Sequence, residues 1–314
     1  MLGARLGLAL LIVATGCASS DSTSGSASTG TLDREPPFEG WRWESSLGVE
    51  VAVPADWGIN EITDGCLITD TATVVRAPGM IFGCESTEPV TKQLVEIKRE
   101  RDLRSDDAAS FRFEQVSVGT EPAERGEGVM PDGRASGRLR IPGIGVIIDA
   151  RVKEIETLRT VFDSVRIVEV DHNACATSRA SMTALPPRAA TFLPSSTNAV
   201  SVCGYTVGEV LGASALIDGD AAIALVAALN QARPGRNIDI PKEACLPQTD
   251  EPPPDVVLVA HGAGDGARVE VTFSSCKHRG MGNGRDEAQL TETLLHEIMN
   301  PLHSGYDYSP AGLR

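Results

Sequence analysis

The sequence predicts an α+β protein with two antiparallel sheets and packed helices, placed behind an N-terminal apolar leader and a flexible tether. Three observations support this class. Many short segments alternate between apolar and polar residues, as half-buried strands do. The later part of the chain twice repeats the order strand, strand, helix. No run of 18 apolar residues occurs, so the sequence predicts no transmembrane helix.

The leader covers residues 1–16. Arg5 gives it a positive start, and residues 6–13 form an apolar core that has the length of the apolar region of a secretory signal and is too short to span a bilayer. Residues 14–16 are small, as a signal peptidase requires, and Cys17 follows directly. This ending resembles the lipobox of bacterial lipoproteins. The resemblance implies that Cys17 is lipidated and becomes the first residue; the alternative is an ordinary signal peptide cleaved nearby.

The tether covers residues 17–37. Residues 18–31 are Ser, Thr, Gly and Ala apart from Asp21. Such a segment buries too little apolar surface to offset the entropy of ordering it, so we expect a flexible linker.

The first domain is expected over residues 38–170, and it opens with a hairpin. Trp41, Trp43 and alternating valines predict two strands that end at Pro54, with a turn at residues 46–48. Together with Trp57, these tryptophans are expected in the core. The further expected elements are a helix over 89–103, strands over 113–118, 134–141 and 145–152, a helix over 154–162 and a closing strand over 165–170.

Two segments of this domain carry a family resemblance. They are residues 47–57, which read LGVEVAVPADW, and residues 160–168, which read TVFDSVRIV. Both are similar to segments of the Mog1/PsbP-like group, in which many bacterial lipoproteins share an antiparallel sheet flanked by helices. The resemblance implies binding or assembly roles and assigns no functional residue.

The second domain is expected over residues 171–303 as a ββαββα unit. Its helices are expected to face a four-stranded antiparallel sheet from one side, and residues 304–314 are expected to fray. The expected elements are hairpins over 200–205 with 210–217 and over 256–260 with 268–273, and helices over 221–232 and 286–299. The inward helix residues are expected to be Ile223, Val226, Ala227 and Leu229, and then Leu290, Leu294, Leu295 and Ile298.

Charge and composition limit the partners. The formal net charge is −15, and an acidic chain repels phosphate backbones, so nucleic acid is not an expected partner. Arginine exceeds lysine, and Ala and Gly are abundant, which resembles actinobacterial proteins.

The seven cysteines indicate an oxidising compartment. Without Cys17 an even number remains, which in an exported chain predicts three disulfides out of 15 possible connectivities. Chain order and hairpin geometry favour Cys66–Cys84, Cys175–Cys203 and Cys245–Cys276. No CxxC spacing supports a metal site instead.

Several motifs suggest chemistry but have simpler interpretations. Gly280–Gly284 lacks the third glycine of a dinucleotide loop, and a turn is the preferred interpretation. His296 and His303 are seven residues apart with Pro301 between them, so they do not form a zinc-protease helix. The other candidates are His261 with Asp265, His278, and the acidic pairs Asp106/Asp107 and Glu121/Glu124, all expected in exposed loops or turns. We therefore expect no metal, no cofactor and no catalytic residue.

Function is predicted only as a class. The first hypothesis is a non-enzymatic extracytoplasmic lipoprotein, lipid-anchored to the cell membrane, that binds or scaffolds an envelope partner. The alternative is a small-molecule-binding lipoprotein with a pocket near Trp57 or between the domains. A weaker alternative is an extracytoplasmic hydrolase, but no GxSxG elbow is present.

Overall fold

The computed structural model describes residues 35, 37–60, 71–76, 93–102, 111–181, 191–206, 209–241, 256–262, 266–273 and 275–303. The leader, Cys17, most of the tether and the tail 304–314 lie outside these residues, as do Cys66, Cys84 and Cys245. In the described part of the chain, no helix is both long enough and apolar enough to span a membrane.

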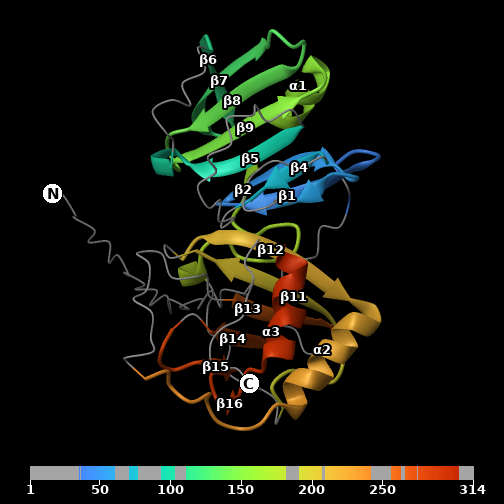
Figure 1. Ribbon diagram of the computed structural model, residues 1–314, viewed down its shortest axis with the longest axis vertical. Helices are drawn as coiled ribbons and strands as arrows, with labels where there is room; N and C mark the ends of the chain where they lie inside the picture. The colour runs from blue at the N-terminus through green and yellow to red at the C-terminus, as the bar shows by residue number, and fades with distance from the viewer. Residues whose placement is uncertain are drawn as a thin grey trace, which may run out of the picture.

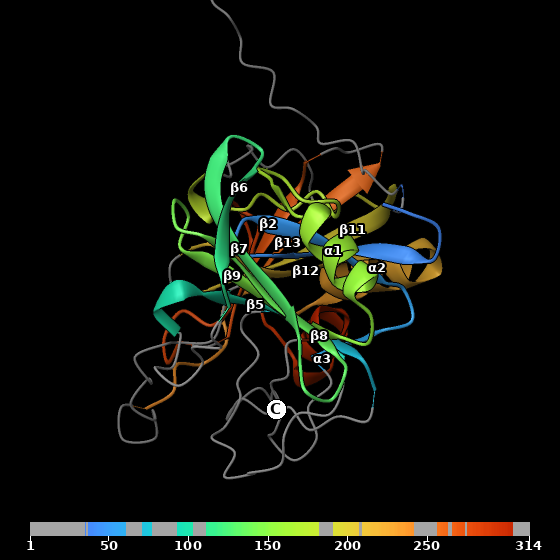
Figure 2. The same cartoon turned by 90° about the horizontal axis from the view of Figure 1, so that it is seen from above.

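Strands dominate the described residues and form three sheets, stacked along the long axis of the molecule (Figures 1 and 2). A three-stranded sheet has the order β1-β2-β10, a seven-stranded sheet the order β3-β4-β5-β9-β8-β7-β6, and a six-stranded sheet the order β12-β11-β13-β14-β15-β16. The strands are β1 (Trp41–Ser46), β2 (Val49–Pro54), β3 (Gly58–Ile59), β4 (Thr73–Val75), β5 (Leu94–Arg99), β6 (Phe113–Val118), β7 (Glu121–Val129), β8 (Ala135–Ile141), β9 (Val146–Val152), β10 (Arg166–Ile167), β11 (Thr197–Tyr205), β12 (Leu211–Asp218), β13 (Val256–Gly262), β14 (Arg268–Thr272), β15 (Gly280–Gly282) and β16 (Glu287–Ala288). The helices are α1 (Ile155–Asp163), α2 (Gly219–Gln231) and α3 (Glu292–Met299), with short 3-10 turns η1 (Glu100–Asp102), η2 (Arg179–Ser181) and η3 (Asn300–Leu302).

The expected hairpins are confirmed, and one expected helix is wrong. β1 pairs with β2, β11 with β12, and β13 with β14, all antiparallel. Residues 94–99, expected as a helix, form strand β5 between β4 and β9. Val95 and Ile97 are buried while Glu96 and Lys98 reach the charged face, so the period is two rather than 3.6. The β3–β4 and β4–β5 pairs are parallel, so this sheet is mixed rather than purely antiparallel.

Strand β7 was also missed by the sequence interpretation. Its residues Glu121 and Glu124 were expected in a polar loop, but they pair with β6 and, for Glu124, also with β8. Glu124 forms an ion pair with Arg140 on the adjacent strand. The buried residues of β7 are Ala123 and Gly126, which are small and three positions apart, so the sequence shows no alternation of large apolar and polar residues.

Helix α1 packs directly on strand β8. Leu158, Val161 and Phe162 are buried in one cluster with side chains of the seven-stranded sheet and of β2. A Cβ added to Gly137 of β8 would lie 2.7 Å from the Phe162 ring. Only glycine therefore allows the helix to approach this closely.

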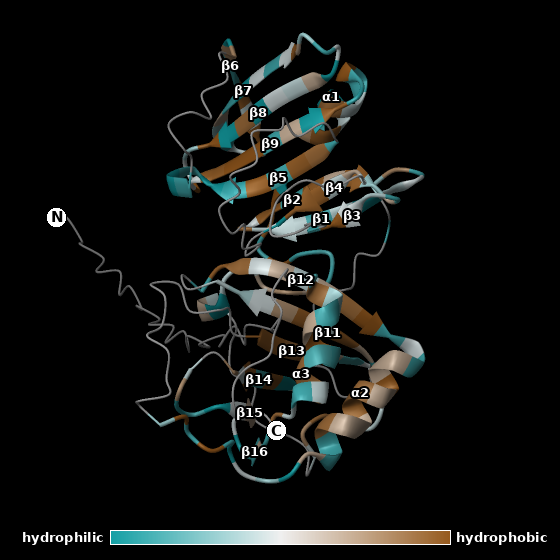
Figure 3. Cartoon of the chain, viewed as in Figure 1, coloured by the Kyte–Doolittle hydropathy of each residue, from teal (hydrophilic) through white to brown (hydrophobic). Residues whose placement is uncertain are grey.

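The six-stranded sheet shares a second cluster with both α2 and α3. Figure 3 shows the central strands of this sheet in the hydrophobic colour and the helices in mixed colours. The inward face of α2 differs from the expectation, because Ala222 and Leu225 are buried with Val226 and Leu229, whereas Ile223 is 55% exposed. Two further strands, β15 and β16, extend the expected four-stranded sheet.

Helix α3 is shorter than expected. It begins at Glu292 behind the N-cap Thr291, whose side chain accepts a hydrogen bond from the Leu294 N–H. Asp286 and Glu287, which we had placed at the helix start, precede it, and Glu287 belongs to β16.

The opposite face of the six-stranded sheet carries the expected Cys175–Cys203 disulfide, which is confirmed. It is buried with Tyr205 and Val257 and ties residues 171–181 to strand β11. Cys276 is also disulfide-bonded, and its partner lies outside the described residues.

Candidate functional site

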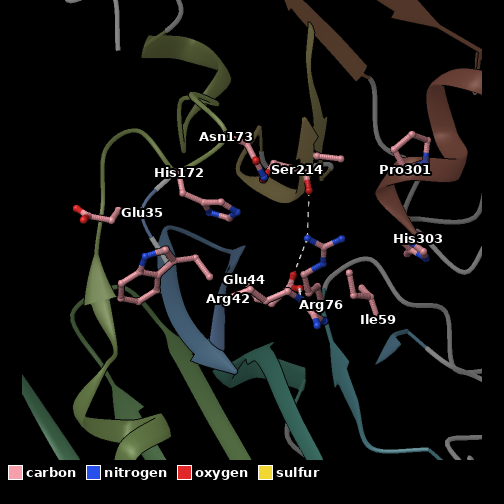
Figure 4. Close-up of a pocket in the computed structure, with 12 residues that line it drawn as sticks. Glu35, Arg42, Glu44, Ile59, Arg76, His172, Asn173, Ser214, Pro301 and His303 are labelled. Atoms are coloured by element: carbon pink, nitrogen blue, oxygen red, sulfur yellow. Dashed lines mark hydrogen bonds and ion pairs between the residues drawn. The ribbon is translucent and has the colours of Figure 1, made fainter. Parts of the chain in front are cut away.

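A cavity among the described residues lies where the N-terminal sheets meet the six-stranded sheet. Main-chain hydrogen bonds join the two sides, including Leu47 N–H to Leu211 O at 2.7 Å. The cavity holds about 290 Å³, and we call it the seam pocket (Figure 4). It is lined by Glu35, Arg42, Trp43, Glu44, Ile59, Arg76, His172, Asn173, Ser214, Ala215, Pro301 and His303.

Arg76 forms the centre of one wall. It follows strand β4, is only 2% exposed, and forms an ion pair with Glu44 of β1 at 3.0 Å. Its guanidinium also donates to the carbonyl of Ser214 at 3.2 Å and to that of Leu302 at 2.9 Å. The side chain of Arg76, which follows a strand of the N-terminal sheets, therefore donates to two main-chain carbonyls of the part of the chain that carries the six-stranded sheet.

Asn60 repeats this bridging on the same wall. Its amide donates to the carbonyl of His303 at 2.6 Å, and its side-chain oxygen accepts from the Arg76 N–H at 2.8 Å. Asn60 has a φ of 48°, a left-handed conformation that asparagine tolerates better than most residues.

His172 lines the pocket opposite Arg76, and Glu50 holds His172 from behind. Glu50 is fully buried on β2, and one of its oxygens accepts from the His172 N–H at 2.7 Å and contacts His172 Nδ1 at 2.9 Å. The same oxygen accepts from the Ser45 hydroxyl at 2.9 Å, and the other accepts from Arg166 at 2.6 Å. The Arg166 guanidinium in turn stacks on Trp43, 4.0 Å from the ring centroid.

These contacts determine the ionisation of Glu50. Burial by itself raises the pKa of the carboxyl, but the hydrogen bonds from His172 and the charges of His172 and Arg166 outweigh it and lower the pKa to about 2. Glu50 is therefore a carboxylate at neutral pH, and His172 Nδ1 carries the proton that faces it.

Asp171 anchors the segment that carries His172. One of its oxygens accepts the N–H groups of Asn173 at 3.0 Å and Cys175 at 2.8 Å, and the other accepts the Ser214 hydroxyl. Burial raises the pKa of this carboxyl, and the charge of Glu50 adds to the rise against the opposing contacts. Because Cys175 is fixed by its disulfide, covalent and polar restraints together place His172 at the pocket.

The site contains no serine-hydrolase arrangement within the described residues. A hydrolase places the hydroxyl and the carboxylate on different nitrogens of the histidine, but Ser45 and Glu50 both contact Nδ1 of His172. The second pair is Ser201 and His261 Nε2, 2.6 Å apart, in which the hydroxyl donates to the carbonyl of Asn173. His261 must then donate to Ser201 and cannot act as its base.

Among the described residues, Glu50, Asp171 and His172 could hold a metal ion, because each offers a ligand atom within 4.8 Å of the others. Their oxygens already accept hydrogen bonds from main-chain N–H groups, hydroxyls and Arg166. A cation would have to displace Arg166 from Glu50, so the arrangement fits a hydrogen-bonded hub better than a metal centre.

The candidates from the sequence are dispersed. Gly280–Gly282 is strand β15, paired with β14 and β16. His278 contacts Arg236 and is exposed. His296 and Glu297 are on α3, and His303 follows η3 in a left-handed conformation and lines the seam pocket. His261 is half-buried rather than exposed, in contact with Ser201. Asp106, Asp107 and Asp265 lie outside the described residues.

The sequence interpretation missed Glu50 and His172. No signal in the sequence indicated Glu50, because the alternation of Val49, Val51 and Val53 places it on the polar face, whereas the structure buries every residue from Val49 to Val53. A carboxylate at such a position requires a partner. The sequence did not indicate that the partner comes from residue 172, which is distant in the chain.

Comparison with models of protein families, with curated proteins and with solved structures gives no match.

Proposed function

We propose that this chain is a non-enzymatic extracytoplasmic binding protein, tethered to the cell membrane through lipid on Cys17, with its ligand site in the seam pocket. The proposal includes two domains, residues 38–170 and 171–303, that meet at this pocket. It also retains the resemblance of the first domain to the Mog1/PsbP-like group, whose members have binding or assembly roles.

The observation that carries the proposal is the convergence of polar side chains on one cavity. Small-molecule sites combine an apolar wall with a few placed polar groups. The seam pocket offers Trp43 and Ile59 beside Arg42, Arg76 and His172. Among the described residues, no nucleophile stands beside a free base at this cavity, which supports binding rather than catalysis.

Ligand binding is tested by native mass spectrometry and thermal shift on the anchored protein purified from membranes. We expect a co-purifying small molecule, or a ligand from a metabolite library, that raises Tm. Ile59→Trp should fill the pocket and abolish the effect, whereas the matched Ile223→Trp on the exposed face of α2 should not. Equal loss in both variants, or no ligand at all, would contradict a seam site and favour a scaffold role.

The anchor is tested separately. Radiolabelled palmitate should enter the wild type and not Cys17→Ala, because a lipobox thiol is the acylated group. Equal labelling of the two proteins would refute the lipid anchor and leave the pocket proposal intact.

A further inference from the structure

We propose that the seam pocket recognises a small organic anion, a carboxylate held by Arg42 and Arg76 with His172 opposite. This inference rests on the proposed function and specifies the ligand class of the same site.

The first support is the state of Arg76. Its two terminal nitrogens are engaged, but its buried Nε makes no hydrogen bond within the part of the chain that the structure describes. A buried N–H without an acceptor costs about 1–3 kcal/mol. Arginine presents Nε and one terminal nitrogen as a fork that matches the two oxygens of a carboxylate.

Arg42 of strand β1 shows the same feature. Its Nε forms an ion pair with Glu44 at 2.6 Å, and one terminal nitrogen donates to the carbonyls of Pro54 and Ala55. The other terminal nitrogen is buried and makes no hydrogen bond with any described residue. Two unused guanidinium N–H groups therefore belong to residues that line one cavity.

The arrangement of the charges also fits an anion. The lining holds Arg42 and Arg76 together with the carboxylates of Glu35 and Glu44, so its formal charge is balanced. Glu44 is paired with both arginines, and the carboxylate of Glu35 points away from the pocket (Figure 4). Behind His172, the Glu50 carboxylate is paired with Arg166. An anion in the pocket therefore meets two guanidinium groups and no unpaired carboxylate.

His172 completes the polar lining. Its Nδ1 is held by Glu50 and Ser45, while Nε2 makes no hydrogen bond with the described residues. Figure 4 shows the ring directed into the pocket, toward Arg76, while the carboxylate of Glu35 points away from it.

The cavity size limits the ligand. About 290 Å³ lies at the lower end of small-molecule sites, roughly 300–1,000 Å³. A compact ligand with one carboxylate and an apolar part that contacts Trp43 and Ile59 fits this lining.

The test is isothermal titration calorimetry on the full-length protein with three probes of one shape: benzoate, benzamide and benzylamine. We expect benzoate to bind at least tenfold more tightly than the other two. If benzamide or benzylamine binds as well as benzoate, the anion inference is overturned and the pocket remains a ligand site. If no probe binds, the inference is overturned, and the library screen above decides whether the proposed function falls with it.

Variants of Arg42 and Arg76 test whether benzoate binds in the seam pocket. Arg42→Gln changes a side chain that is 26% exposed, so the fold should survive, and it should weaken benzoate at least tenfold without affecting benzamide. Arg76→Lys, which keeps the charge beside Glu44 but removes the fork, should also weaken benzoate. The matched control is Arg140→Gln, which removes a distant arginine paired with Glu100 and Glu124. If the control weakens benzoate as much as Arg42→Gln does, long-range charge rather than the pocket is responsible, and the inference fails.

Discussion

Replacement of Glu50 by glutamine tests the hydrogen-bonded hub that holds the seam together. The carboxylate accepts hydrogen bonds from His172, Ser45 and Arg166 in a fully buried position. Glutamine keeps the size but loses the charge, and it leaves Arg166 without its buried counter-ion. Because the Arg166 side chain is 39% exposed, water compensates part of its lost pairing, and the cost comes mainly from the hydrogen bonds of the buried carboxylate.

The pKa gives an independent magnitude. The pKa of Glu50 falls from its ordinary value of 4.5 to about 2 on folding, and each pH unit corresponds to 1.36 kcal/mol, so the charge contributes about 3 kcal/mol. Because the folded pKa is the lower one, this stability is fully present above pH 4.5 and is lost as the pH falls toward 2. Asp171, whose pKa is raised, acts in the opposite sense, since its neutral form is favoured in the folded protein.

The assay is urea unfolding of wild type and Glu50→Gln between pH 7 and pH 2.5. We expect a difference of about 3 kcal/mol at pH 7 that shrinks steadily below pH 4.5. The control is Glu124→Gln, a partly exposed partner of Arg140, which should cost less than about 1 kcal/mol. Two results would each refute the conclusion that the hydrogen bonds of Glu50 stabilise the fold. In one, Glu50→Gln lowers the free energy of unfolding by no more than the control does; in the other, it lowers it by an amount that does not depend on pH.

Three further predictions concern the fold. The double variant Cys175→Ala, Cys203→Ala opens a loop with a sequence separation of 28, which should lower the free energy of unfolding by about 3.5 kcal/mol; an unchanged urea midpoint would contradict this. Gly137→Ala should cost about 1–3 kcal/mol because the added methyl meets Phe162, measured by thermal denaturation; a neutral result would mean that α1 does not pack this closely. Leu229→Ala should cost about 2–5 kcal/mol and Ile223→Ala less than about 1, whereas similar large costs at both positions would restore the α2 face expected from the sequence.

The hairpins could be predicted because their signals are local. Alternation in residues 49–53 and turn residues between the strands determine β1, β2 and their register, and the same holds for β11 with β12. The Cys175–Cys203 bridge was also predictable, because the two cysteines are close in sequence and stand alone in their region.

Strand β5 and the inner face of α2 were not predictable in this way. Over a window as short as residues 94–99, the apolar residues fit both the helical period of 3.6 and the strand period of two. The segment forms a strand because it pairs with β4 and β9. Helix α2 is apolar around most of its circumference, so the sequence does not state which stripe is buried. Its orientation against the sheet buries Leu225 and leaves Ile223 exposed.

By itself, the sequence determined the strand-rich class, the hairpins, one disulfide and the acidic charge, because each depends on neighbours in the chain. Only the tertiary structure decided the seam pocket. Arg76 meets Ser214 and Leu302, and Glu50 meets His172, across more than a hundred residues. Such contacts leave no periodic trace in the sequence, since a buried charge is tolerated wherever folding happens to bring it a partner.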